Sequence, residues 1–71
     1  MNSPASTPVL PRQLYKVTEA MIVLSISRSV LYDEMRTGRL RSVTRGRSRL
    51  IPASAIADYV TLLERESRAA L

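Results

Sequence analysis

The first run of apolar residues at helical spacing predicts a short helix from Thr18 to about Ser25. Thr18 is a favoured N-cap, and Glu19 follows it in the first turn, where the helix dipole favours a negative charge. Val17 before this cap and Ile22 four residues after it fit a hydrophobic staple. We therefore expect the chain to enter the helix at Thr18.

A second helix is predicted almost at once, with Ser27 as its N-cap and Gly38 as its stop. Ile26 and Leu31 fit a second staple around this start. Leu31 and Met35 share one side of the helix and should face the core. Another arc of the same helix carries residue types that commonly contact DNA: Arg28, Ser29, Tyr32 and Arg36.

Two short runs that contain β-branched residues, 40–44 and 48–51, flank a turn around a central glycine and predict a β-hairpin. Val43, together with Leu50 or Ile51, is expected to anchor this hairpin to the core. The arginines of the segment would then fringe its tip.

A third helix is predicted from a cap at Ser54 to about Arg68, after Pro52 ends the second strand. Its apolar positions follow the spacing of a stripe that faces a core: Ile56, Tyr59, Val60 and Leu63. The predicted fold is thus mainly α with a small β-hairpin, in the order α-α-β-β-α.

The division of the chain follows from this pattern. Residues 1–13 hold three prolines among small polar residues and show no apolar period, so we expect a disordered N-terminal arm. Residues 14–68 form the predicted domain, and residues 69–71 are left as a C-terminal tail.

Charge singles out one part of this domain. The 71-residue chain has a formal net charge of +5. The whole excess lies between Arg28 and Arg49, where there are seven arginines and two acids, while four basic and four acidic residues balance elsewhere. Charge gathered in one window indicates a surface that binds a polyanion, with nucleic acid as the first choice.

Several function classes lack support. The chain has no cysteine and no histidine, and it offers no paired carboxylates or phosphate-cradling loop, so we expect no catalysis, no metal and no cofactor. A membrane-surface protein is the competing class, but it would need one amphipathic helix with a basic face. The basic residues here fall on a helix, a connection and a hairpin. With no apolar run of about 18 residues and no leader pattern, a cytoplasmic, nucleoid-associated protein without membrane contact is expected.

The first two predicted helices, joined by about three residues, make a helix-turn-helix candidate. In that motif the second helix enters the major groove, and the free amides at its N-terminus attract phosphate. Asp33 and Glu34 should lie off the interface, although Asp33 could hold an arginine in place. Tyr32 is as compatible with partial burial as with a DNA contact. The predicted DNA-binding residues of this helix are Ser27, Arg28, Ser29, Tyr32 and Arg36.

The hairpin is the predicted second contact, on the flanking backbone or in the adjacent minor groove, where arginine is favoured. The alternative is that the arginines of this hairpin belong to an ordinary solvated turn and make no DNA contact. The predicted wing residues are Arg45, Gly46, Arg47, Ser48 and Arg49. Supporting contacts are expected from Lys16, Thr18, Arg39 and Arg41.

Five short motifs, taken together in this order and spacing, resemble the excisionase-type helix-turn-helix family over residues 14–63. They are LYKVTEA at 14–20, LSISRSVLY at 24–32, GRL at 38–40, GRSR at 46–49 and IPASAIADY at 51–59. The resemblance implies a winged helix-turn-helix of the MerR-like kind.

The same resemblance implies one of two functions. Some members are phage excisionases, or recombination directionality factors, which bind near an attachment site, bend DNA and direct an integrase toward excision; others are transcriptional regulators. We take excisionase as the first expectation. Its partners would be double-stranded DNA, a phage integrase and neighbouring copies on the DNA, with a monomer in free solution because no coiled-coil extension is present.

Overall fold

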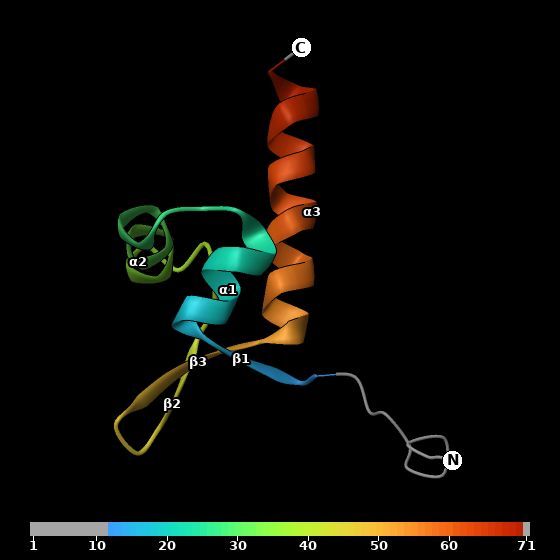
Figure 1. Ribbon diagram of the computed structural model, residues 1–71. Helices are drawn as coiled ribbons and strands as arrows, with labels where there is room; N and C mark the ends of the chain where they lie inside the picture. The colour runs from blue at the N-terminus through green and yellow to red at the C-terminus, as the bar shows by residue number, and fades with distance from the viewer. Residues whose placement is uncertain (1–11, 71) are drawn as a thin grey trace, which may run out of the picture.

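The computed structural model describes residues 12–70, which fold into helices around a small sheet (Figure 1). The order of helices and hairpin strands matches the sequence-based prediction, and one further strand precedes the first helix in the chain. The predicted arm over 1–13 lies outside the described residues except for Arg12 and Gln13, and Leu71 of the predicted tail also lies outside them. The elements in chain order are β1 (Leu14–Lys16), α1 (Val17–Leu24), α2 (Arg28–Arg36), β2 (Val43–Arg45), β3 (Ser48–Pro52) and α3 (Ala53–Ala69).

The sheet is antiparallel in the order β1-β3-β2, so β3 is its central strand. The predicted hairpin is confirmed: Arg45 pairs with Ser48, and Gly46 and Arg47 make the two-residue turn between them. Gly46 has a φ of 60°, which glycine adopts without steric cost and which turns of this length require.

The strand β1 was not predicted. Only three residues long, it is too short to show an alternating pattern, and its partner lies far along the chain: Tyr15 pairs with Ile51. The pairing therefore comes from tertiary structure and left no local signal. It places the start of the domain against the inner half of the hairpin.

Two predicted helix starts were wrong. Lys16, not Thr18, is the N-cap of α1, and the carboxylate of Glu19 accepts a 2.8 Å hydrogen bond from the Lys16 backbone N–H. Ile22 is 79% exposed, so the predicted staple to Val17 does not form.

The start of α3 also differs from the prediction. The helix begins at Ala53, directly after the extended Pro52, so Ser54 lies inside the first turn instead of capping it. The Ala53 N–H donates to the carbonyl of Gln13 at 2.8 Å. The β1–β3 pairing supplies that acceptor, which replaces a local side-chain cap.

The predicted boundaries of α2 are confirmed. The Ser27 hydroxyl accepts from the Val30 N–H at 3.3 Å, as an N-cap does, and Gly38 follows the helix with a φ of 83°. Ser25, between α1 and α2, adopts a left-handed conformation with a φ of 57°. That conformation lets the chain reverse within a few residues and sets the second helix across the first.

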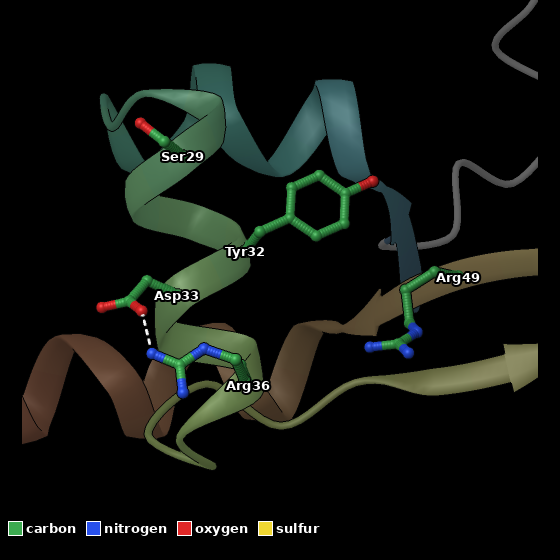
Figure 2. Close-up of a pocket in the computed structure, with 5 residues that line it drawn as sticks. All are labelled: Ser29, Tyr32, Asp33, Arg36 and Arg49. Atoms are coloured by element: carbon green, nitrogen blue, oxygen red, sulfur yellow. Dashed lines mark hydrogen bonds and ion pairs between the residues drawn. The ribbon is translucent and has the colours of Figure 1, made fainter.

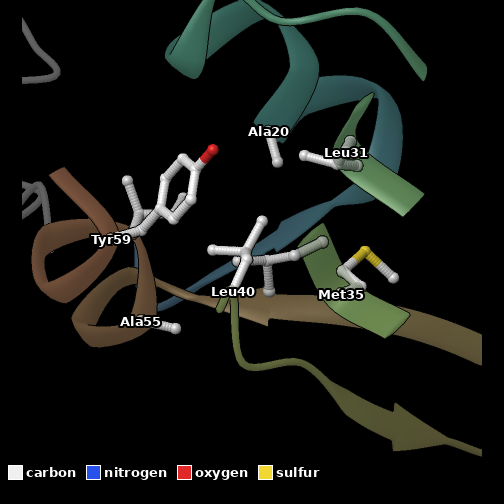
Figure 3. Packing of buried hydrophobic residues seen from close by; sticks show 8 residues of the cluster. Ala20, Leu31, Met35, Leu40, Ala55 and Tyr59 are labelled. Carbon is white, nitrogen blue, oxygen red and sulfur yellow. The ribbon is translucent and has the colours of Figure 1, made fainter. Parts of the chain in front are cut away.

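The core lies where α1, α2, α3 and β3 meet (Figure 3). The predicted inward positions of Leu31, Met35 and Tyr59 are confirmed. Full burial of a side chain such as Leu31 contributes about 1.5–3 kcal/mol. The buried set is Ala20, Leu31, Met35, Leu40, Ile51, Ala55, Ile56 and Tyr59.

Other apolar predictions need correction. Val60 and Leu63 are 40% and 37% exposed, because the later turns of α3 run past the body of the domain (Figure 1). In the hairpin, Ile51 is fully buried while Val43 is 43% exposed. The hairpin is therefore anchored through its central strand rather than through β2.

Candidate nucleic-acid interface

The α2 helix and the hairpin wing line two adjoining hollows on the surface. The first has a volume of about 530 Å³ and is lined by Ser29, Tyr32, Asp33, Arg36 and Arg49 (Figure 2). The second, of about 370 Å³, is lined by Lys16, Val17, Thr18, Tyr32, Arg47, Ser48, Arg49 and Leu50. Because Tyr32 and Arg49 line both, we refer to the two hollows together as the α2–wing groove.

The groove brings together most of the predicted contact residues. It joins three residues of α2, three of the wing, and two at the start of α1, although the sequence places them in separate segments. Those residues are Ser29, Tyr32 and Arg36, then Arg47, Ser48 and Arg49, and finally Lys16 and Thr18. Arg45 and Gly46 lie at the wing's turn, and Ser27 and Arg28 lie at the start of α2.

Tyr32 occupies the middle of the groove. It is 44% exposed, and its ring extends from α2 toward the start of α1 (Figure 2). Partial burial, one of the two possibilities open from the sequence, is thus observed, and the exposed part of the side chain lines the groove. A DNA contact by Tyr32 stays a prediction.

Asp33 is placed differently from the expectation. Its side chain is 58% exposed and lines the groove beside Arg36, with which it forms an ion pair (Figure 2). Asp33 thus lies beside the predicted contact residues instead of away from them, and the alternative, that it holds an arginine, is confirmed. An i,i+3 spacing of opposite charges was the available signal.

The seven arginines between 28 and 49 divide into two groups. Three form ion pairs: Arg36 with Asp33, Arg39 with Glu34 and Glu66, and Arg41 with Asp58 at 2.6 Å. Within residues 12–70, four have no ion-pair partner: Arg28, Arg45, Arg47 and Arg49. The charge free to meet a polyanion thus lies at the start of α2 and along the wing.

Arg39 belongs to a cluster that holds α2 against α3. Its Nε lies 3.1 Å from both carboxylate oxygens of Glu34, and its terminal nitrogens donate to Glu66 at 2.5 and 2.8 Å. The hydrogen bonds that Arg39 donates to Glu66 and Glu34 raise the pKa of Arg39, and Arg39 in turn lowers the pKa of Glu66. Arg39 was predicted as a supporting DNA contact, but its guanidinium is occupied inside the domain.

Arg41, like Arg39, was predicted as a supporting DNA contact. It forms an ion pair with Asp58 of α3 and does not line the groove.

The N-terminus of α2 has backbone amides that precede the first intrahelical hydrogen bond. That bond runs from the Leu31 N–H to the Ser27 carbonyl at 2.9 Å, so the amides of Arg28 and Ser29 lie before it. Such amides, with the helix dipole, favour an anion.

The comparison with known proteins fits this geometry. The helix-turn-helix domain family matches residues 14–61. The chain is also similar to a protein named excisionase from Streptomyces ambofaciens, 39% identical over 54 residues that cover 76% of this chain and 86% of the relative. This chain belongs to the excisionase-type helix-turn-helix family. No solved structure matches the chain significantly.

Membership of the excisionase-type family identifies α1 and α2 as the helix-turn-helix and the β2–β3 hairpin as its wing. In helix-turn-helix domains in general, the second helix is the recognition helix, which enters the major groove of duplex DNA. The family and the excisionase relative indicate an excisionase-like, non-catalytic DNA-binding protein. Within residues 12–70, no helix has the length and apolar character needed to cross a bilayer.

Proposed function

We propose that this protein is an excisionase: it binds specific duplex sites near a phage attachment site, bends the DNA there and directs an integrase toward excision. The observation that carries the proposal is the 39% identity to an excisionase across most of both chains. The α2–wing groove supports it, because a helix and a basic hairpin face the same hollow surface.

The DNA contacts follow from the two groups of arginines. In this proposal, Arg28, Ser29 and Tyr32 meet the major groove, while Arg47 and Arg49 meet the flanking backbone or the neighbouring minor groove. Arginine is the commonest side chain to read guanine and is favoured in a narrow minor groove. Arg36 contacts bases from within its pair with Asp33.

The size of the domain favours action in several copies. A single module of this kind covers on the order of 600–1,000 Å² of protein surface, which gives modest affinity by itself. We expect a monomer in free solution and several copies on adjacent DNA sites. Each added copy would offset part of the bending energy, about 1–6 kcal/mol for a site of tens of base pairs.

The test is a titration of the full chain onto a natural attachment region. Gel shifts on circularly permuted fragments measure the bend, and an excision assay with the cognate integrase measures function. Stepwise cooperative shifts, a bend and stimulated excision are the expected results. One non-cooperative complex that leaves excision unchanged but represses a nearby promoter would identify a transcriptional regulator instead.

A further inference from the structure

One acid stands in the α2–wing groove among residues suited to contact DNA. Asp33 lines the same hollow as Ser29, Tyr32 and Arg36 of α2 and Arg49 of the wing (Figure 2). A carboxylate there repels the phosphates that the surrounding arginines attract. Its position therefore weakens general DNA binding at the surface where such binding is otherwise favoured.

The ion pair of Asp33 changes what Arg36 can do. It neutralises the Arg36 charge before DNA arrives, so this arginine adds little to sequence-independent attraction. It also orients the guanidinium toward Asp33, because Nη2 donates to Asp33 Oδ1. Within residues 12–70, the other N–H groups of Arg36 have no hydrogen-bond partner, and they remain available for a guanine edge.

We infer that Asp33 is a specificity-determining residue that positions Arg36 to read a guanine and suppresses binding to duplexes that lack it. This inference rests on the proposed sequence-specific DNA binding but not on integrase or excision. Specificity gained by penalising the wrong partner is a known use of repulsive charge in interfaces. The price is a lower affinity for DNA in general.

The chain provides a matched control in Asp58. Asp58, like Asp33, is an exposed aspartate that pairs with one exposed arginine, in this case Arg41 at 2.6 Å. Neither Asp58 nor Arg41 lines the α2–wing groove. Asp33→Asn and Asp58→Asn therefore release one arginine each and change the net charge equally, but only the first does so at the groove.

The experiment measures dissociation constants of the full chain for two duplexes of equal length. One is selected from a random library by the wild-type protein, and the other is a scrambled version of it. We expect Asp33→Asn to raise affinity for the scrambled duplex several-fold, to steepen the salt slope by about 0.9, and to lower the specific-to-scrambled ratio about tenfold. Asp58→Asn should change the affinities for the specific and the scrambled duplex by the same factor. Asp33→Glu should keep the specific-to-scrambled affinity ratio of the wild type.

Two further readouts separate positioning from general charge. In an Arg36→Ala background, Asp33→Asn should no longer change which base the selected site prefers, because the residue that reads it is gone. Thermal melts of the two asparagine variants should match, since both positions are exposed. An unchanged ratio in Asp33→Asn, or equal changes on both duplexes, would overturn the inference. Failure of the wild type to select any sequence would instead count against the proposed function itself.

Discussion

The Tyr59 hydroxyl donates a 2.6 Å hydrogen bond to the carboxylate of Glu34, joining α3 to the recognition helix. Tyr59 is almost fully buried, and the Glu34 carboxylate also accepts a hydrogen bond from Arg39. This contact fixes the C-terminal half of α2 against the domain. The orientation of α2 thus depends in part on a bond near its C-terminal end.

Tyr59→Phe should therefore destabilise the fold. The substitution removes the hydroxyl but keeps the buried ring, so the loss is that of one hydrogen bond to a charged group, about 1.5–3 kcal/mol. For a domain of this size each 1 kcal/mol lowers Tm by roughly 4–8 °C. The control is Tyr32→Phe, whose ring is half exposed and whose loss should be within about 0.5 kcal/mol. Equal effects in the two variants would contradict the role of the Tyr59 bond.

Stability should fall at high pH through the same residue. Burial and the nearby Glu34 carboxylate raise the pKa of Tyr59 to about 12, above its ordinary value of 10.0. The unfolded chain therefore ionises first as pH rises. The contribution of Tyr59 is complete below about pH 10 and is lost as pH approaches 12. The free energies of unfolding of wild type and Tyr59→Phe, measured in urea, should converge as pH rises across this range. A constant difference between them would argue against a titrating Tyr59.

Arg39→Ala should reduce stability more than Arg41→Ala, although both arginines form ion pairs. Arg39 bridges Glu34, whose side chain is only 14% exposed, to Glu66, whereas Arg41 and Asp58 are both exposed. Removing Arg39 leaves Glu34 largely enclosed without its counter-ion, while an exposed pair contributes little. Thermal melts rank the two. A DNA-binding loss in Arg39→Ala at temperatures where it is folded would instead favour the original prediction of a direct contact.

The salt dependence of DNA binding should reflect the arginines that are not paired. Four such arginines lie at the start of α2 and on the wing, so log affinity should fall with log salt at a slope of roughly −3 to −4 per protomer, from about −0.9 per phosphate. A slope much steeper than this would mean that the ion pairs of Arg36, Arg39 or Arg41 open on DNA.

Arg28→Ala and Arg47→Ala should differ in what they lose. Arg28 lies at the start of the recognition helix, so Arg28→Ala should reduce the binding free energy on the specific site by about 1–3 kcal/mol and relax base preference there. Arg47, in the wing's turn, should weaken binding to all duplexes evenly. Arg65→Ala on the exposed face of α3 is the control and should change neither. Identical losses for Arg28→Ala and Arg47→Ala on every sequence would contradict this division.

The sequence predicted those parts of the fold whose causes are local. Ser27 caps α2 through its own hydroxyl, and Gly38 and Gly46 take the left-handed conformations that glycine permits. Periodicity correctly assigned Leu31 and Met35 to the core. Each of these signals lies within a few residues of the structure that it specifies.

The errors at β1, at the start of α3 and at two of the arginines have distant causes. Strand β1 forms because β3 lies beside it, and α3 starts at Ala53 because the Gln13 carbonyl is in reach. For the same reason charge counting treated Arg39 and Arg41 like the other arginines, since their partners Glu66 and Asp58 are on α3. The contact function of the individual site residues stays a prediction.

The central position of β3 has a mechanical consequence for the complex with DNA. The wing includes the outer part of β3. The inner part of the same strand has Ile51 buried in the core, and it pairs with β1 on the edge opposite β2. The base of the hairpin, at residues 50–52, is therefore held by β1, and we expect it to resist moving as a unit on DNA. Where the shapes of protein and DNA differ, the compliant member is the DNA, whose base steps differ in stiffness. In the proposed complex, the flexibility of the flanking DNA sequence would therefore contribute to the choice of site.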